Sequence, residues 1–189
     1  PRFTLRTPVG SAEVRLGVAG AHQAANAAAA VAAGLACRVD LGTLAAGLEQ
    51  AVGSAWRMEI HRGWFTVVND AYNANPDSVR AALHTVATLP GRHVAVLGKM
   101  AELGPVEAEE HRRMGAEARR LGYAAVVAVG EDPGIAAGAG DIAIVVPDTA
   151  TARTRVMELV APGDVVLVKA SRAVGLEVLA EDLRQEALS

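Results

Sequence analysis

The sequence predicts an α/β protein in which a mostly parallel, doubly wound sheet occupies the C-terminal part. From residue 93 onward, short apolar segments alternate with amphipathic helical stretches in the order strand, helix, strand, strand, helix, strand, helix. The apolar segments are nearly continuous, as expected for strands buried on both faces. Glycine or proline separates most of them from the helices. Together these observations favour a Rossmann-like arrangement.

The composition is that of an ordinary globular protein with a substantial core. Of the 189 residues, 51% are hydrophobic and 21% are charged, and the net charge is −3. The sequence has no basic stripe of the kind that binds nucleic acid, and no apolar run reaches the length of a membrane span. Cys37 is the single cysteine, so an intrachain disulfide is excluded. We therefore expect a cytoplasmic protein without nucleic-acid partners or membrane insertion.

The N-terminal part is predicted to contain a β-hairpin, two helices and two strands. The expected ranges are 2–7 with 12–18, 22–35, a helix capped by Asp40, 57–61 and 65–70. A helix follows Asn75 and ends before Pro90 and Gly91, after which the strand–helix rhythm changes. We place a domain boundary near this helix, giving domains of residues 1–83 and 84–189.

The C-terminal part is predicted to contain four strands and three helices. The strands are expected at 93–97, 125–129, 142–146 and 165–168, and the helices at 105–121, 149–160 and 176–184. The first of these helices carries glutamates in its early turns and arginines near its end, an order that complements the helix dipole. The glycine-rich stretch 134–140 is expected to form a loop.

The turn at residues 70–78, Asp-Ala-Tyr-Asn-Ala-Asn-Pro-Asp-Ser, connects a predicted buried strand to a predicted helix. Turns at the carboxyl ends of strands are where open α/β sheets place their ligands. A structural explanation fits the same residues equally well. Asn75 before Pro76 is a good helix N-cap, and Asp70 and Asn73 are common turn residues.

This turn resembles the signature turn of the Mur ligase family, in particular of the members that add D-alanyl-D-alanine. Three further segments resemble motifs of the same family in the same order. They are Gly-Ala-His-Gln-Ala-Ala-Asn at 20–26, Leu-Gly-Lys-Met-Ala-Glu-Leu-Gly at 97–104 and Lys-Ala-Ser-Arg-Ala-Val-Gly-Leu-Glu at 169–177. The four segments span nearly the whole chain, which makes the resemblance specific.

The resemblance implies an ATP-dependent ligase with UDP-MurNAc-tripeptide and D-alanyl-D-alanine as substrates, ATP and Mg²⁺ as cofactors, and an acyl phosphate intermediate. Residues 1–83 would be the end of the central ATP-binding domain, and residues 84–189 the C-terminal domain. The phosphate loop and the metal ligands are then expected in an upstream part of the same protein. Gly98-Lys99 does not form a phosphate loop, because His93 and Met100 break the required pattern. The alternatives are another ligase of the superfamily, of the tripeptide-forming (MurE) or folylpolyglutamate synthase type, and a non-catalytic nucleotide-binding module.

For nucleotide binding, the resemblance implies residues from two of the motifs and an arginine between them. They are His22, Gln23, Asn26, Arg57, Asp70, Asn73 and Asn75. Gln23 stands where the family usually has asparagine, so its head group is displaced by one methylene. Asp70 is implied in ribose binding and Arg57 in phosphate binding. Without the family, His22 and Asn26 fit a helix start, and Arg57 fits a solvated charge at a strand end.

For substrate binding, the resemblance implies Tyr72, Glu102, Lys169, Ser171 and Arg172. The last three offer two cations and a hydroxyl that suit a carboxylate or phosphate. Glu102 suits the amine of D-alanyl-D-alanine or a lysine of the upstream part. No residue is assigned as catalytic or as a metal ligand. Without the family, each of these side chains fits an ordinary surface position.

Overall fold

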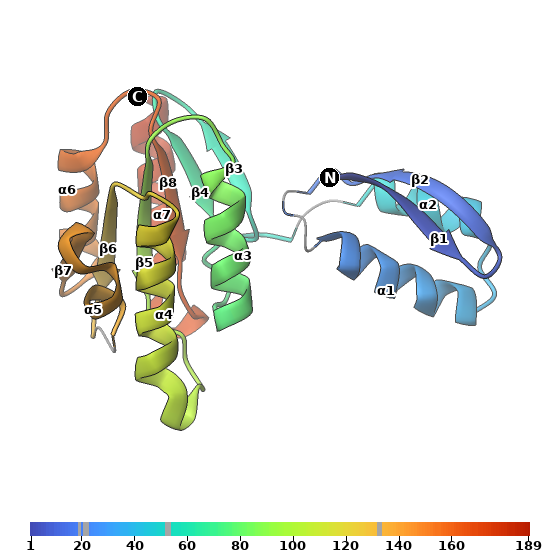
Figure 1. Ribbon diagram of the computed structural model, residues 1–189. Coiled ribbons are helices and arrows are strands. Elements are labelled where there is room, and N and C mark those ends of the chain that lie inside the picture. The colour runs from blue at the N-terminus through green and yellow to red at the C-terminus, as the bar shows by residue number, and fades with distance from the viewer. Residues whose placement is uncertain (19, 21–22, 52–53, 132–133) are drawn as a thin grey trace. The chain divides into compact units, whose positions relative to one another are not determined.

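The computed structural model describes residues 1–18, 20, 23–51, 54–131 and 134–189 (Figure 1). It divides the chain into two compact units, Pro1–Ser54 and Ala55–Ser189. Each unit is described by itself.

The first unit is a small α/β element. Strands β1 (Arg2–Thr7) and β2 (Gly10–Arg15) form an antiparallel hairpin, followed by helices α1 (Gln23–Ala36) and α2 (Leu41–Glu49). Asp40 caps α2 as the sequence predicts, because its carboxylate accepts a hydrogen bond of 2.9 Å from the Thr43 N–H. The buried core of this unit is small and consists of Leu5, Val14, Leu16, Ala27 and Val31.

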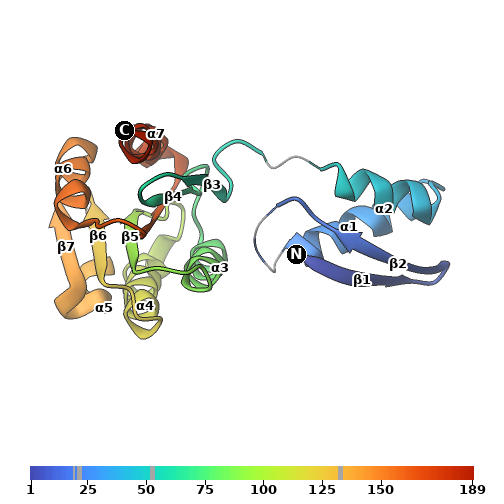
Figure 2. The same cartoon turned by 90° about the horizontal axis from the view of Figure 1, so that it is seen from above.

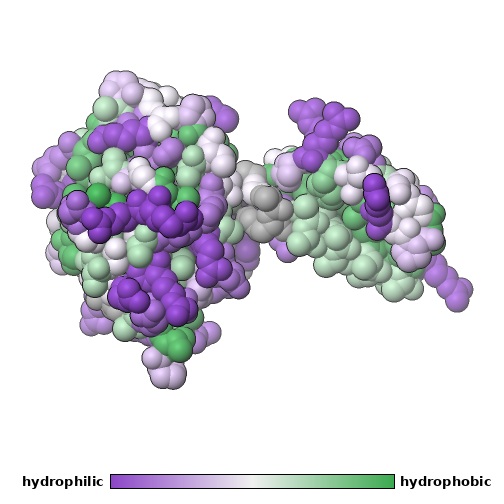
Figure 3. Space-filling view, in the orientation of Figure 1, coloured by the Kyte–Doolittle hydropathy of each residue, from purple (hydrophilic) through white to green (hydrophobic). Residues whose placement is uncertain are grey.

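Helix α1 is unusual because its 14 residues, QAANAAAAVAAGLA, include no charged side chain. The unit buries Ala27 and Val31 of this helix and leaves most of the other alanines exposed. Figure 3 shows the surface over α1 largely in the pale green of weakly hydrophobic residues. Helices without a charged face are normally covered by other protein.

The second unit is built on a six-stranded sheet with the order β3-β4-β8-β5-β6-β7. The strands are β3 (Glu59–Arg62), β4 (Thr66–Asn69), β5 (His93–Gly98), β6 (Ala125–Val129), β7 (Ala143–Val146) and β8 (Val165–Lys169). The β3–β4 pair is antiparallel, and the other neighbouring pairs are parallel. Every residue of β6 and β8 is buried, which explains their continuous apolar sequence. The predicted mostly parallel sheet is confirmed.

Helices cover both faces of this sheet (Figure 2). Helices α3 (Pro76–Ala87), α4 (Glu107–Arg120) and α5 (Ile135–Ala139) lie on one face, and α6 (Thr149–Leu159) and α7 (Leu176–Leu188) on the other. Short 3₁₀ turns occur at Gly104–Val106, Gly140–Ile142 and Arg172–Val174. The chain reverses its winding direction between β5 and β8, and such a switch point leaves a crevice at the carboxyl ends of the strands.

The boundary between the two units differs from the one expected at 83/84, which falls inside α3. Strand β4 belongs to the second unit because it pairs with β8 from Thr66↔Val165 to Asn69↔Val168. The Trp64 N–H also donates a 2.9 Å hydrogen bond to the Ala187 carbonyl near the C-terminus. The break at Pro90 and Gly91 therefore ends a helix within one unit. The boundary was misplaced because the pairing of β4 with β8 is long-range and leaves no local sequence signal.

The expected loop at 134–140 was also wrong, because Ile135–Ala139 form α5. This helix packs closely against α4. A Cβ atom at Gly138 would lie 1.8 Å from the Arg112 carbonyl oxygen, and one at Gly115 would lie 2.0 Å from the Ile135 carbonyl oxygen. The glycines thus permit close helix contact, so glycine content alone was misleading here.

We expect a fragment of residues 55–189 to fold by itself and a fragment of residues 84–189 to fold poorly. The shorter fragment lacks β4, which removes buried Phe65 and Val67 from the core and exposes an edge of β8. Near-ultraviolet circular dichroism and urea unfolding of the two fragments measure this difference. Equally cooperative unfolding of both fragments would contradict the boundary at Ser54/Ala55.

Candidate functional site

Three loops meet at the carboxyl ends of β4, β5 and β8 and surround a cavity of about 800 Å³. The turn after β4 contributes residues 72–75, the loop after β5 residues 101–103, and the loop after β8 residues 171–173. Trp56, which precedes β3, completes the lining. Segments that are distant in sequence are thus brought to the switch point of the sheet, the position where ligands bind in open α/β folds.

A buried ion pair lies at the base of these loops. The Lys169 Nζ atom is 2.7 Å from Asp70 Oδ2, and the two residues are only 2% and 9% exposed. Nζ also donates to the Asn73 carbonyl at 2.8 Å, while Asp70 Oδ1 accepts from the Met58 N–H at 3.0 Å. Both charges are therefore paired and hydrogen-bonded, which a buried ion pair needs in order to be stable. The pair connects the end of β8 to the turn after β4.

The pKa of the Lys169 ammonium reflects opposing influences. Burial lowers the pKa below its ordinary value, the Asp70 carboxylate raises it, and Arg57 lowers it further. The direction is therefore downward, with desolvation as the main cause. Asp70 is thus the partner that keeps the ammonium charge at this buried position.

Ser171 connects the other two loops. Its Oγ atom accepts a 2.8 Å hydrogen bond from the Ala101 N–H and donates one of 3.2 Å to the Ala74 carbonyl. Its own N–H donates to the Lys99 carbonyl at 3.0 Å. Ser171 is 4% exposed. Its hydroxyl therefore holds the loop after β5 against the turn after β4.

The loop after β5 is also held from the side of α4. His111 is fully buried, and its Nε2 atom accepts a 2.7 Å hydrogen bond from the Met100 N–H. Its Nδ1 atom lies 2.7 Å from the Glu107 carbonyl, so this nitrogen carries the proton. Lys99 forms a 3.0 Å ion pair with Glu107. Glu102 has a left-handed backbone with φ of 65° and lies exposed at the cavity.

Two arginines stack on aromatic rings in this region. The Arg57 guanidinium carbon lies 4.3 Å from the centre of the Tyr72 ring, and that of Arg172 lies 4.2 Å from the centre of the Trp56 ring. Both distances are within the range of cation–π attraction. Stacking holds each guanidinium by its face and leaves edge donors for other partners.

The residues predicted for substrate binding fall into two groups. Tyr72, Glu102 and Arg172 line the cavity and are exposed. Lys169 and Ser171 are buried, and their side chains are engaged in the internal bonds described above, although Ser171 also borders the cavity. The motif lies in a loop that lines the cavity, but the sequence carried no signal of which side chains turn inward.

The residues predicted for nucleotide binding are distributed over both units. In the second unit, Asn75 caps α3 through a reciprocal capping box with Ser78, and the Asn73 Oδ1 atom accepts from the Ala74 N–H at 2.9 Å. In the first unit, Asn26 donates to Gln23 Oε1 at 3.0 Å. His22 lies outside the described residues. The cap predicted at Asn75 is thus confirmed.

Trp56 lines the cavity although no sequence motif predicts it there. Trp56 lies three residues before β3 and next to Arg57, an arrangement that matches no known motif, and its position at the cavity depends on the fold. The available signal was its proximity to Arg57, because aromatic and arginine side chains are frequent neighbours at binding sites.

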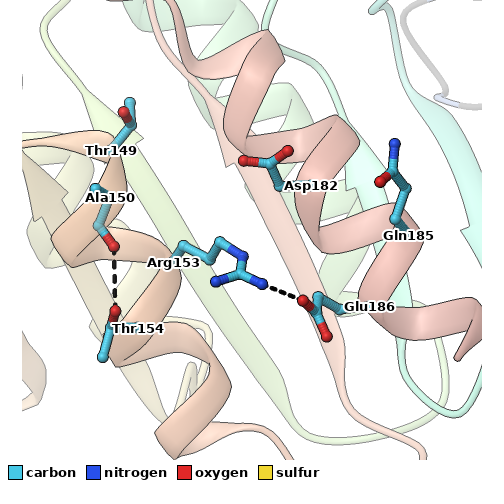
Figure 4. Close-up of a pocket in the computed structure, with 7 residues that line it drawn as sticks. All are labelled: Thr149, Ala150, Arg153, Thr154, Asp182, Gln185 and Glu186. Atoms are coloured by element: carbon cyan, nitrogen blue, oxygen red, sulfur yellow. Dashed lines mark hydrogen bonds and ion pairs between the residues drawn. The ribbon is translucent and has the colours of Figure 1, made fainter.

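A second hollow of about 440 Å³ lies between the flanks of α6 and α7 (Figure 4). Arg153 points across it and is paired with Glu186. Its remaining lining consists of Thr149, Ala150, Thr154, Asp182 and Gln185. The Arg153 guanidinium is already paired, and none of the motif segments lines this hollow, so we take the three loops as the candidate functional site.

Neither a metal centre nor a membrane-crossing helix is found in the part of the chain that the structure describes. Its His, Cys, Asp and Glu side chains form no group of three or more that could hold a metal ion. None of its helices is both long and apolar enough to span a bilayer.

A family model described as the Mur ligase glutamate ligase domain matches residues 56–172. The chain belongs to the Mur ligase family. The match covers every strand of the six-stranded sheet and all three cavity loops up to Arg172. The family resemblance predicted from the motifs is confirmed.

Individual Mur ligases are similar to almost the whole chain. UDP-N-acetylmuramoyl-tripeptide–D-alanyl-D-alanine ligase of Mycobacterium bovis is 42% identical over 97% of this chain and 42% of that protein. The Escherichia coli ligase of the same name is 33% identical over 97% of this chain and 41% of that protein. A crystal structure of MurF from Acinetobacter baumannii matches with a TM-score of 0.90 and 35% identity, over 97% of this chain and 42% of that chain. The chain thus spans about two-fifths of the length of the curated relatives it matches.

We expect Lys169→Met to destabilise the second unit by about 3–5 kcal/mol, because it leaves the Asp70 carboxylate buried and unpaired. The double variant Lys169→Met/Asp70→Asn should recover much of this loss, since no buried charge then remains unpaired. Urea unfolding followed by tryptophan fluorescence measures the effect, because both tryptophans, Trp56 and Trp64, lie in this unit. Additive effects of the two substitutions would contradict a coupled ion pair.

Proposed function

We propose that the chain is part of an ATP-dependent ligase that joins D-alanyl-D-alanine to UDP-MurNAc-tripeptide in peptidoglycan precursor synthesis. The observation that carries the proposal is the meeting of three motif segments, 70–78, 97–104 and 169–177, around one cavity at the switch point of the sheet. The names of the relatives that are 42% and 33% identical over 97% of the chain support the same activity.

The cavity has the chemistry that a small zwitterionic dipeptide requires. Glu102 brings a carboxylate for the ammonium group, and Arg172 brings a guanidinium for the terminal carboxylate. Ala74, Ala101 and Ala173 line the space with small apolar groups that suit methyl side chains. We infer that Lys169 and Ser171 act by holding the loops in place and that Tyr72, Glu102 and Arg172 contact substrate.

For the nucleotide, we propose the residues that the family resemblance implies. Arg57 offers an exposed guanidinium for phosphate oxygens, and its stacking on Tyr72 restricts its orientation. The Asp70 carboxylate retains lone pairs beyond the bonds to Lys169 and Met58, so a ribose hydroxyl is a possible further partner. Asn73 and Asn75 from the same turn, with His22, Gln23 and Asn26 of the first unit, complete the proposed set.

The cofactor ATP would supply the phosphoryl group that activates the tripeptide carboxylate. The dipeptide amine then attacks the acyl phosphate carbon, forming the amide bond and releasing phosphate. In this scheme Glu102 orients the amine and Arg172 holds the opposite end of the dipeptide. The amine is thus kept in the geometry for attack, which lowers the entropic part of the barrier. We propose that Mg²⁺ is bound by residues of an upstream part of the protein, and that the enzyme acts in the cytoplasm.

We further propose that the first unit is the end of an ATP-binding domain and the second a C-terminal ligase domain. The family match begins at residue 56, next to the boundary at Ser54/Ala55. The uncharged helix α1 supports this division, because an upstream part of the same domain would cover its exposed alanines.

We expect the complete ligase to release phosphate from ATP only when UDP-MurNAc-tripeptide, D-alanyl-D-alanine and Mg²⁺ are all present. The 189-residue chain alone should be slower by several orders of magnitude, because its sequence contains no phosphate loop to hold the β- and γ-phosphates. A coupled phosphate-release assay with each substrate omitted in turn tests both statements. Turnover of the complete protein that is independent of D-alanyl-D-alanine would overturn the proposed activity.

A further inference from the structure

Arg172 stands between two competing partners. Its guanidinium carbon lies 4.2 Å from the centre of the Trp56 ring, and its Nη2 atom lies 3.9 Å from Glu177 Oε1. A charge-assisted hydrogen bond between guanidinium and carboxylate is normally about 2.7–2.9 Å long. The ion pair with Glu177 is therefore open, although Glu177 lies only five residues further along the chain, at the start of α7.

Glu177 is also incompletely satisfied. Its Oε2 atom is buried and has no hydrogen-bond partner among the described residues. A buried carboxylate oxygen without a donor is unfavourable, and the nearby Arg172 guanidinium could satisfy it by closing into a two-point contact. The guanidinium instead lies over the Trp56 ring, and Arg172 lines the cavity.

The position of Trp56 is itself fixed by the site. Its backbone is left-handed, with φ of 57°, a conformation that a residue with a bulky side chain rarely adopts. The Tyr72 N–H donates a 3.1 Å hydrogen bond to the Trp56 carbonyl, and the Met58 N–H is held by Asp70. The surrounding bonds thus maintain a strained backbone that places the indole at the cavity, which is typical of functional positions.

We propose that Trp56 is a positioning residue that keeps Arg172 away from Glu177 and open to the terminal carboxylate of the incoming dipeptide. Trp56 thereby sets the preference of the site for substrates with a free carboxylate. This inference rests on the proposed function and deepens it. A carboxylate fits better than a phosphate because Glu102 lines the same cavity, where it attracts the ammonium end of a dipeptide and repels a polyanion.

The test compares D-alanyl-D-alanine with its C-terminal carboxamide as substrates of the complete ligase. The ratio of their kcat/KM values measures recognition of the carboxylate, whereas a general structural defect lowers both values together. We expect the unmodified enzyme to prefer the free dipeptide by about tenfold or more, as charge-assisted recognition normally gives. Trp56→Leu should reduce this preference by about fivefold, mainly through the KM of the free dipeptide.

Two further variants test whether Trp56 acts by positioning Arg172 or only by filling space. Trp56→Phe keeps an aromatic face and should retain most of the preference. In the Trp56→Leu background, Glu177→Gln removes the competing charge and should restore part of the preference. Arg155→Ala, which breaks an exposed pair with Glu158 outside the cavity, serves as the control and should leave the preference unchanged.

An unchanged preference in Trp56→Leu, or no recovery on adding Glu177→Gln, would overturn the positioning role of Trp56. A reduced preference for UDP-MurNAc-tripeptide or ATP, with the dipeptide ratio intact, would instead assign Arg172 to a phosphate and also contradict the inference. Failure of the unmodified enzyme to use D-alanyl-D-alanine at all would contradict the proposed function itself, so the two failures are distinguishable.

Discussion

The buried contact between Lys169 and Asp70 is the interaction on which the site depends. Removing an ammonium and a carboxylate from water is costly, and the cost is offset only when both charges are paired and hydrogen-bonded. Here the ammonium contacts Asp70 and the Asn73 carbonyl, and the carboxylate also receives the Met58 N–H. These bonds join the end of β8, the turn after β4 and the segment before β3. They therefore hold together three segments that contribute residues to the cavity.

In the site, one set of side chains holds the loops in place and another set is available to contact a ligand. Lys169, Ser171 and His111 are buried, and each bonds to backbone groups of the loops, Lys169 in addition to its ion pair with Asp70. The exposed side chains around the cavity, among them Tyr72, Glu102 and Arg172, keep polar atoms for a ligand. A rigid inner layer of this kind orders the loop backbone in advance, which lowers the entropic cost of binding a small substrate.

Local sequence signals predicted most of the second unit. Continuous apolar strands, the cap at Asn75 and the charge order of the 107–120 helix each have a local physical cause, and each was found in the structure. Long-range features were not predictable in this way. Because β4 pairs with β8, it belongs to the second unit, and the boundary lies at Ser54/Ala55 and not at 83/84. The glycine-rich stretch forms α5, whose glycines allow close contact with α4. The motif predicted that the loop of Lys169 and Ser171 lies at the site. That both side chains are buried depends on tertiary packing, which the motif does not show.

A crystal structure of the complete ligase with D-alanyl-D-alanine and a non-hydrolysable ATP analogue would show whether the dipeptide binds between the three loops. We expect the dipeptide carboxylate at Arg172 and its ammonium group at Glu102, with the indole of Trp56 still stacked on the guanidinium. Lys169 should remain bound to Asp70 and make no contact with either ligand. A structure in which Lys169 leaves Asp70 to bind substrate, or in which the dipeptide lies outside the three loops, would contradict the account.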